Sequence, residues 1–489
     1  MFSRRSCVEH FLAAGPIQRQ NFSRDDKGMA KLFSECFDTV LRFNTTQKEW
    51  ACFDGKIWKP DRGGMMAANA AKVFADSLAI YAFQLADGSE KTDFIRFVNK
   101  YGDYSRRKIL VEDARSEMFF SNEDLDRDGR LYNCQNGVLN LETGVLLPHK
   151  PEYLLSKISN VYYDPAATAP LFNQTLHEVL QDDADKICFL QKAFGLTLTT
   201  DTSCEEMYIL YGPTTRNGKS TILETVSHMH GGSEGYALSM VPETLAQRKT
   251  KDSRQASGDI ARLDGCRMLT VSEPPKRMIF DAALLKTLLG RDTITARHLH
   301  EREFQFIPVF TLFMNTNYLP VIQDDTLFSS GRIKVIEFSR HFSPEEQDTT
   351  LKNRLRSRDE LSGTFNFCFE GLKLFREVGI DPPSVVVQAV KSYREASDKI
   401  ANFLSDRMER TGKNTGAGTV YQAYRTWCID CGFGIESKQN FFSELKAKGL
   451  FSPSGTVNGM TVRNVIIGYE LIPDNDPPPP EEPPYYGHF

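Results

Sequence analysis

A glycine-bounded segment at residues 212–220 carries the residue types that hold phosphate groups. Gly218, Lys219 and Ser220 follow the apolar run 207–211, and Thr221 opens a stretch with helical character. A strand, a turn, Gly-Lys-Ser and a helix in that order form the usual context of a phosphate-binding loop. Backbone N–H groups at the start of such a helix carry partial positive charge and point at phosphate oxygens. The sequence therefore predicts a nucleoside triphosphate site, and the alternative is a chance Gly-Lys-Ser on a surface turn.

Each residue of this loop has an expected task. Lys219 should reach the β- and γ-phosphates, and the Ser220 hydroxyl should ligate Mg²⁺. Gly212 stands six residues before Gly218, so the loop is one residue longer at its front than the usual spacing allows. The residues expected to contact the nucleotide are Gly212, Pro213, Thr214, Thr215, Arg216, Asn217, Gly218, Lys219, Ser220 and Thr221.

An acidic residue follows a second predicted strand. Residues 267–272 are rich in apolar side chains, and Glu273 comes directly after them. At the carboxyl end of a strand beside the phosphate loop, such an acid can polarise the attacking water and support the metal indirectly. Position 272, where many such enzymes place a Mg²⁺-supporting acid, is Ser272. The alternative is a surface glutamate before a Pro-Pro turn.

Two further strands end or begin with polar residues. Asn317 follows the apolar run 310–314 and can orient the water, and we favour it over Asn315 because a proline stands three residues on. Arg332 lies where a loop enters a strand, and an arginine there can reach a neighbouring subunit's site and stabilise charge on the γ-phosphate. Between Glu273 and the apolar run 310–314, a predicted hairpin is either an ordinary charged hairpin or a nucleic-acid contact, through Arg297, His298, His300 and Arg302.

Bulk properties indicate a protein of several domains that is not a membrane protein. The chain has 489 residues, of which 40% are hydrophobic and 25% charged, and its apolar runs are too short to span a bilayer. No secretory signal is recognised, and ten scattered cysteines favour a reducing cytoplasm. Cys428 and Cys431 are expected to be structural thiols rather than zinc ligands. The net charge of −5 allows a local basic channel.

Periodicity predicts an α/β motor between smaller domains. Residues 31–43 read as an amphipathic helix, and Trp50 and Trp58 flank a hairpin turn as core residues or, alternatively, as nucleic-acid stacking residues. The expected regions are a flexible lead-in (1–30), a mixed helical and β N-terminal domain (31–170), the motor with two entry helices (171–345), a helical connector (346–395), a winged-helix-like domain (396–472) and a disordered, Pro-rich acidic tail (473–489). Lys438, Lys446 and Lys448 in the winged-helix-like domain could contact phosphates or simply be solvated.

Taken together, the motifs resemble those of the poxvirus and phage-type primase-helicase family, whose motor is a superfamily 3 helicase of the AAA+ class. The matching segments are YGPTTRNGKST, RMLTVSEP, LLKTLLGRDTITAR, TLFMNTNYLP and GRIKVIEF, in that order. Upstream, WACFDGKIW, NCQNGVLNLETGVLLPH and the YDP at 163–165 resemble the domain that precedes this motor. The resemblance covers about residues 30–470.

This resemblance implies an ATP-driven ring, usually hexameric, that translocates on single-stranded or forked DNA during replication of a phage, plasmid or mobile island in a bacterial cytoplasm. Lys219 and Ser220 would bind ATP and Mg²⁺, Glu273 would activate water, Asn317 would be the sensor and Arg332 would act in trans. The hairpin around residues 298–302 would line the pore. Only pore-facing residues need be positive, so six modestly acidic subunits can still grip DNA. No primase module is expected before the helical domain, so a separate primase or replication initiator would be a partner.

Two other functions stay open at this stage. The chain could be an origin- or partner-binding initiator that uses ATP as an assembly switch, as the winged helix and the Pro-rich tail suggest. It could also be a DNA-packaging or RNA-directed ATPase. Stimulation of hydrolysis by single-stranded DNA, duplex DNA or RNA separates these functions.

Overall fold

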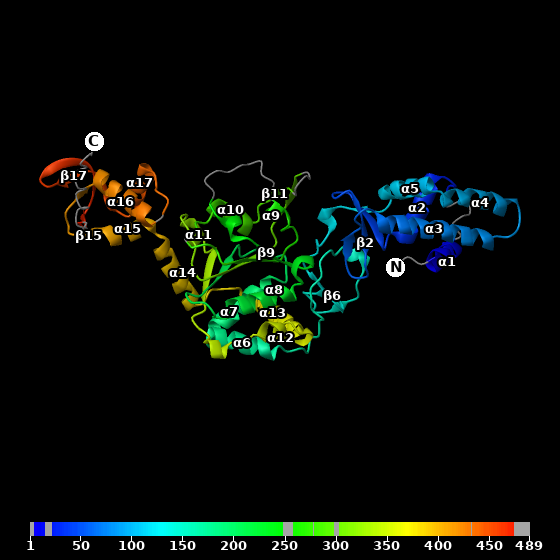
Figure 1. Ribbon diagram of the computed structural model, residues 1–489, viewed down its shortest axis with the longest axis horizontal. Helices are drawn as coiled ribbons and strands as arrows, with labels where there is room; N and C mark the ends of the chain where they lie inside the picture. The colour runs from blue at the N-terminus through cyan, green and yellow to red at the C-terminus, as the bar shows by residue number, and fades with distance from the viewer. Residues whose placement is uncertain are drawn as a thin grey trace, which may run out of the picture.

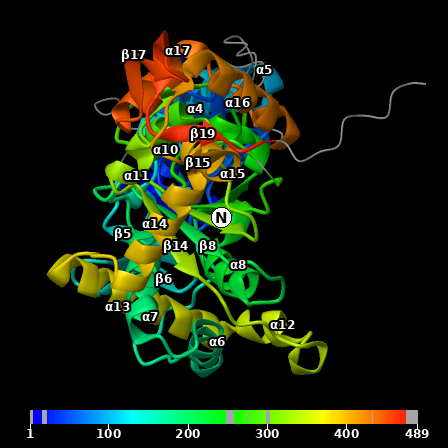
Figure 2. The same ribbon diagram turned by 90° about the vertical axis from the view of Figure 1, so that its left-hand side faces the viewer.

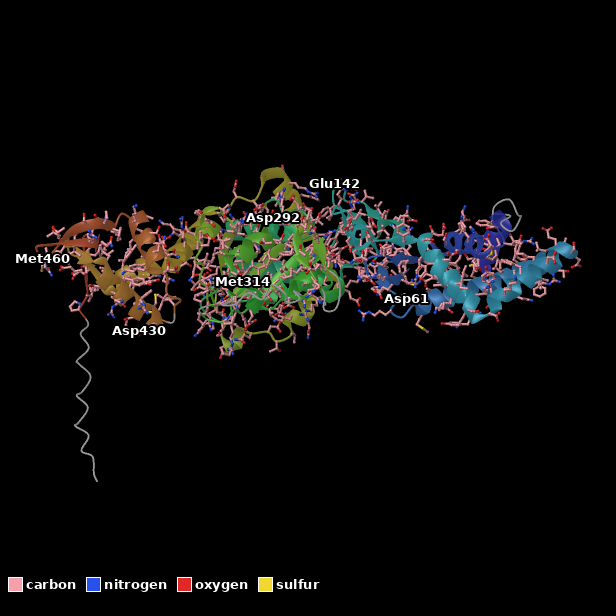
Figure 3. The ribbon with its side chains drawn as sticks, turned by 90° about the horizontal axis from the view of Figure 1, so that it is seen from above. Asp61, Glu142, Asp292, Met314, Asp430 and Met460 are labelled. Carbon is pink, nitrogen blue, oxygen red and sulfur yellow. The ribbon has the colours of Figure 1, made fainter. Side chains whose placement is uncertain are left out.

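The computed structural model describes residues 4–14, 22–247, 258–276, 278–297, 303–431 and 433–473. They form three parts that follow one another along the longest axis of the molecule, with the N-terminal part at one end and the C-terminal part at the other (Figure 1). Seen from above, Asp61 lies in the N-terminal part, Met314 in the central part and Met460 at the far end (Figure 3).

A five-stranded parallel sheet in the order β14-β8-β13-β10-β9 forms the centre. Its side chains alternate between two covered faces. Tyr208 and Leu210 enter one hydrophobic core and Met207 and Ile209 the other, which explains why these strands read as continuous apolar runs. The strands are β8 (Met207–Tyr211), β9 (Ala237–Met240), β10 (Met268–Ser272), β13 (Thr311–Thr316) and β14 (Ile333–Glu337).

Helices cover both faces of this sheet (Figure 1). On one face lie α6 (Pro170–Leu180), α7 (Ala184–Leu196), α8 (Lys219–Met229), α12 (Leu351–Leu355) and α13 (Arg358–Val378). On the other lie α9 (Gly258–Ala261), α10 (Ala282–Leu289), α11 (Thr326–Ser329) and α14 (Ser384–Ser397). A hairpin of β11 (Ile294–Ala296) and β12 (Phe304–Phe306) stands beside the sheet. The helices expected before the phosphate loop are present as α6 and α7.

The N-terminal part combines a helical layer with two small sheets. Its helices are α1 (Arg4–Ala14), α2 (Asp26–Phe37), α3 (Met65–Gln84), α4 (Ser89–Asn99) and α5 (Tyr104–Asp113). The sheets are β3-β2-β1-β4, from β1 (Leu41–Asn44), β2 (Glu49–Phe53), β3 (Trp58–Pro60) and β4 (Phe119–Phe120), and β5-β6-β7, from β5 (Leu131–Cys134), β6 (Gly137–Asn140) and β7 (Leu146–Leu147). Trp50 and Trp58 are buried, in agreement with the interpretation as core residues.

Two expectations for the start of the chain are wrong. Residues 1–30 are not irregular throughout, because α1 packs on α3 through Phe11, whose ring meets Phe74 edge-on at 5.8 Å. The helix predicted over 31–43 instead begins at Asp26, where Asp25 caps it by accepting from the N–H of Gly28, and it ends at Phe37. Leu41–Asn44 pairs with β2 as a strand, because tertiary pairing overrides the helical periodicity there.

A buried polar network joins the N-terminal part to the motor. Tyr132 on β5 donates to Nδ1 of His230 at 2.9 Å, and Nε2 of His230 lies 2.8 Å from Oγ1 of Thr197. The Thr197 hydroxyl donates to the carbonyl of Phe194, so it accepts from Nε2 and the imidazole is neutral. Burial, and then the nearby guanidinium of Arg267, lower the pKa of His230 to about 3.

Arg267 forms a second link across the same boundary. It is 1% exposed and donates to the carbonyls of Leu198 at 2.6 Å and Leu131 at 2.9 Å. Its guanidinium also lies 4.5 Å from the ring centroid of Tyr236. Because β10 starts at the next residue, the strand that leads to Glu273 is anchored to the N-terminal part.

Within residues 399–431 and 433–473, the C-terminal part has three helices, a long β-hairpin and two small strand pairs. Its elements are α15 (Lys399–Arg407), β15 (Met408–Arg410), β16 (Thr415–Gly416), α16 (Ala417–Cys431), α17 (Lys438–Ala447), β17 (Phe451–Val457), β18 (Met460–Ile466) and β19 (Tyr469–Leu471). Aromatic side chains fill its core, where the rings of Tyr424 and Phe441 stack at 4.4 Å. Cys428 is buried in this core, as a structural thiol should be. The tail from residue 474 lies outside the described residues.

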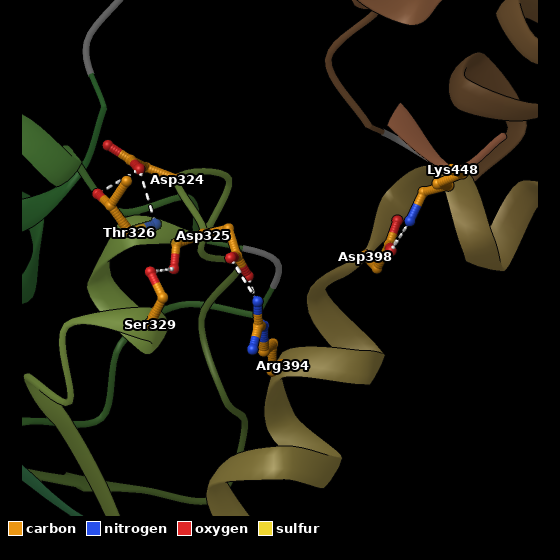
Figure 4. Close-up of polar contacts among 7 residues, drawn as sticks. All are labelled: Asp324, Asp325, Thr326, Ser329, Arg394, Asp398 and Lys448. Atoms are coloured by element: carbon orange, nitrogen blue, oxygen red, sulfur yellow. Dashed lines mark hydrogen bonds and ion pairs between the residues drawn. The ribbon is translucent and has the colours of Figure 1, made fainter. Parts of the chain in front are cut away.

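Helix α14 connects the motor to the C-terminal part (Figure 2). Tyr393 is 3% exposed and donates to the carbonyl of Pro320 at 2.5 Å. Arg394 forms a two-pronged ion pair with Asp325, with both contacts at 2.5 Å (Figure 4). In the part of the chain that the structure describes, no helix is long and apolar enough to cross a bilayer.

Candidate nucleotide site

The phosphate loop connects β8 to α8 at the carboxyl edge of the sheet. Gly218 precedes α8 with φ 79°, and Arg216 also has a left-handed backbone, with φ 59°. A Cβ on Gly218 would lie 2.2 Å from Cγ1 of Val179. The loop between Gly212 and Asn217 is exposed, whereas Asn217 and Lys219 are buried. The chain therefore presents loop backbone to solvent and holds its lysine inside.

Lys219 is held by oxygen atoms of the chain itself. Its Nζ donates to Oδ1 of Asn217 at 2.7 Å, to Oδ1 of Asn317 at 2.8 Å and to the carbonyl of Gly212 at 3.5 Å. Burial lowers the pKa of Lys219 to about 8, and the carboxylate of Glu273 acts in the opposite direction. The structure thus brings together three predicted residues, Lys219, Asn317 and Glu273.

Glu273 and Ser220 occupy the same edge of the sheet. Glu273 is exposed and has φ 53°, and its N–H donates to the carbonyl of Asn315 at 2.9 Å. Nδ2 of Asn315 also donates to the Ser220 hydroxyl at 2.7 Å. Sequence reasoning ranked Asn317 above Asn315, but the structure places both amides in the site. The two asparagines are two residues apart at the end of β13, and this spacing was the sign that both side chains could reach the site.

The segment after β14 holds the phosphate loop in place through hydrogen bonds. No sequence pattern indicated this contact. The N–H of Phe342 donates to the carbonyl of Arg216 at 2.9 Å, and Nδ1 of His341 lies 2.9 Å from the carbonyl of Thr215. Nδ2 of Asn217 donates to the carbonyl of Thr214 at 2.7 Å and reaches the carbonyl of Phe338 at 3.4 Å. Because β14 is paired with β8, its carboxyl end brings residues 338–342 against the loop.

Arg332 is not part of the same site. Its carbonyl accepts from the N–H of Met207, the first residue of β8, so it lies at the amino edge of the sheet, opposite Gly212. Its guanidinium pairs with Glu205. Arg297 directly follows β11 and is half-buried. His298, His300 and Arg302 lie outside the described residues.

The site fits Mg²⁺ held by few protein ligands. Among the described residues, no group of three or more His, Cys, Asp or Glu side chains could hold a metal by itself. Mg²⁺ commonly takes one or two protein oxygens and completes its shell with phosphates and water. The Ser220 hydroxyl and the nearby Glu273 suit that arrangement.

Comparisons with known proteins agree with this description. Residues 30–181 match the family model described as D5 N terminal like. The chain is 26% identical over 328 residues to a protein of Acanthamoeba polyphaga mimivirus named "Putative helicase L207/L206", covering 62% of this chain and 33% of that protein. It is 25% identical over 269 residues to "Putative helicase 022R" of Frog virus 3 (isolate Goorha), covering 51% and 27%.

The chain thus spans about a third or less of the length of these curated relatives. Among solved structures, the apo structure of the NrS-1 C terminal region matches with a TM-score of 0.50 and 11% identity, covering 91% of this chain and 100% of that one. This likeness shows a shared mixed α/β fold with a parallel sheet. The resemblance to the primase-helicase family is confirmed: the chain carries a D5 N-terminal-like region and has viral homologues named as helicases.

Proposed function

We propose that this protein is an ATP-dependent replicative DNA helicase of a virus or mobile element, with an AAA+ motor of the superfamily 3 type. The observation that carries the proposal is the cluster of Lys219, Asn317 and Glu273 around a phosphate loop at the carboxyl edge of a parallel sheet. The strand order β14-β8-β13-β10-β9 supports it, because it puts the sensor strand between the loop strand and the strand of the acid.

The residues of the chain have distinct tasks in hydrolysis. Lys219 and the loop N–H groups bind and orient the β- and γ-phosphates, and Ser220 holds Mg²⁺, which supplies charge neutralisation when bound. Glu273 accepts a proton from the attacking water, and its exposed position leaves room for that water. Asn317 orients the water or the γ-phosphate through its amide.

A ring of subunits completes this scheme. Arg332 lies at the opposite edge of the sheet from its own phosphate loop, which supports a role at the site of a neighbouring subunit. The β11–β12 hairpin, whose first strand is followed directly by Arg297, is proposed to face DNA in the pore. Apart from residues 1–30, where α1 stands in the expected irregular lead-in, the regions set out from the sequence belong to the same proposal, with a winged-helix C-terminal domain built on α15–α17 and the β17–β18 hairpin.

Strand separation tests the function directly. The purified protein with ATP and Mg²⁺ is expected to unwind a forked DNA duplex, and Lys219→Ala is expected to abolish unwinding while the protein remains folded. Robust unwinding by Lys219→Ala would refute the motor assignment.

A second function is an initiator that uses ATP as an assembly switch. The separately folded C-terminal part, with its own aromatic core and long β-hairpin, favours it. Tight binding to one duplex sequence, with hydrolysis unlinked to translocation, would select this function over the motor.

A further inference from the structure

Asn315 lies between β8, which leads into the phosphate loop, and β10, which leads to Glu273. It lies on β13, the middle strand of the sheet, and is 5% exposed. In the strand register it pairs with Leu210 of β8 on one side and Ser272 of β10 on the other. Its side chain contacts Ser220 in the first turn of α8, and its carbonyl accepts from Glu273. A single buried residue therefore touches the proposed metal ligand and the proposed base.

Ser220 needs such a contact because of the residue at position 272. A hydroxyl that ligates a metal is oriented by a neighbouring hydrogen-bonding group, which is often a carboxylate. Here the strand of the acid ends in Ser272, which is exposed. The group that reaches the Ser220 hydroxyl is the amide of Asn315, from the adjacent strand.

We propose that the Asn315 side chain is a positioning group that orients the Ser220 hydroxyl for Mg²⁺. It takes the place of an acid at position 272, and the inference rests on the proposed ATPase function. An amide offers both a donor and an acceptor, so the same side chain can accept the hydroxyl proton when the lone pairs of Ser220 face the metal. The buried amide needs no counter-charge, unlike a carboxylate in the same place.

Nucleotide binding with and without metal tests the assignment. A fluorescent ATP analogue is titrated in EDTA and then in Mg²⁺, using the wild type, Asn315→Leu, Asn315→Asp and Ser272→Ala. Loss of an outer contact to a metal ligand weakens metal affinity by about 10–100-fold. Asn315→Leu is therefore expected to need about 10-fold or more Mg²⁺ for the same tightening of binding. Its affinity in EDTA, which depends on Lys219 and the loop, should stay within about twofold of wild type.

The other two variants distinguish positioning from a packing effect. Asn315→Asp keeps a group that accepts the hydroxyl proton, so it should restore most of the Mg²⁺ response. Ser272→Ala should match the wild type. Equal weakening of Asn315→Leu in EDTA and Mg²⁺, an unrestored Asn315→Asp, or a lost Mg²⁺ response in Ser272→Ala would overturn the inference.

Protein folding and the proposed function are checked separately in the same experiment. Thermal unfolding monitors each variant, and if Asn315→Leu does not fold, the near-isosteric Asn315→Asp and the shorter Asn315→Ser carry the comparison. Ser should lose the Mg²⁺ response, because its shorter side chain cannot reach Ser220, and Asp should keep it. A wild type that binds no nucleotide would refute the proposed function, whereas a wild type and Asn315→Leu with the same Mg²⁺ response would refute only the role of Asn315.

Discussion

Lys219 donates a 2.8 Å hydrogen bond to Asn317, which joins the first turn of α8 to the residue that follows β13. The two residues are 98 positions apart in the chain, yet in the sheet β8 and β13 are immediate neighbours. The bond therefore links the phosphate loop to the segment that continues to Pro320 and α11. A phosphate that attracts Lys219 acts on both elements.

Nucleotide binding should take up protons at alkaline pH. The pKa of Lys219 in the free protein is about 8, and a phosphate beside it favours the charged form and raises this pKa. At pH 8.5, binding should take up roughly 0.7 of a proton. Calorimetry in buffers of different ionisation enthalpy measures this number. Lys219→Arg, which is always charged, is the control and should show no such uptake; equal uptake by both proteins would contradict the prediction.

Gly212→Ala should weaken nucleotide binding. The added Cβ would lie 2.0 Å from Nδ2 of Asn217 and 2.8 Å from Nζ of Lys219, so the bonds that hold the lysine must break. Binding of the fluorescent nucleotide should fall by at least about tenfold, a cost of ~1.4 kcal/mol, because the displaced Lys219 no longer lies where it can meet the phosphates. Gly418→Ala is the matched control, because its Cβ would meet nothing within 4 Å, and it should bind as the wild type does.

Mixed rings should recover hydrolysis if Arg332 acts in trans. Arg332→Ala and Lys219→Ala subunits are each expected to be inactive alone. When they are mixed, some interfaces pair an intact phosphate loop with an intact Arg332, and ATPase activity should pass through a maximum as the ratio is varied. No recovery at any ratio, with rings confirmed by native mass spectrometry, would exclude the trans role.

Tyr393→Phe should destabilise the protein more than Arg394→Ala. The buried Tyr393 hydroxyl satisfies the carbonyl of Pro320, and an unsatisfied buried group costs about 1–3 kcal/mol. Arg394 and Asp325 are half-exposed, and exposed ion pairs contribute only ~0–1 kcal/mol. Urea unfolding of both variants measures the difference in the free energy of unfolding, and the opposite order would show that the ion pair dominates.

His230 should make the protein sensitive to acid. The pKa of His230 is about 3 in the folded protein and 6.5 in the unfolded chain. Between these two pH values the unfolded state therefore binds more protons than the folded state. The free energy of unfolding should therefore fall as pH drops below 6.5, by up to ~1.4 kcal/mol per pH unit from this residue.

His230→Gln removes that titration and keeps a neutral polar side chain. Its unfolding free energy, measured in urea from pH 7 to pH 4, should fall less steeply than that of the wild type. Parallel curves for His230→Gln and wild type would argue against a buried neutral imidazole.

The sequence predicted which polar side chains lie together better than it predicted the elements that support them. Lys219, Glu273 and Asn317 could be expected to converge because parallel strands end at one edge of a sheet, where the residues after each strand meet. The contact of residues 338–342 with the phosphate loop was not predictable, because it depends on β14 lying next to β8. Asn315 was ranked second because sequence spacing does not show which amide faces Ser220. At the amino terminus, helix α1 was missed because Phe11 finds its partner on α3, far along the chain.

The three donors of Lys219 are already engaged by Asn217, Asn317 and Gly212. An incoming phosphate must displace at least one of these oxygens, so the protein carries a built-in competitor for its own ligand. Anions with fewer charges and fewer oxygen atoms than a triphosphate gain little binding free energy from replacing these oxygens. A nucleotide therefore binds only if its contacts with the loop are stronger than the hydrogen bonds of Lys219 that it replaces.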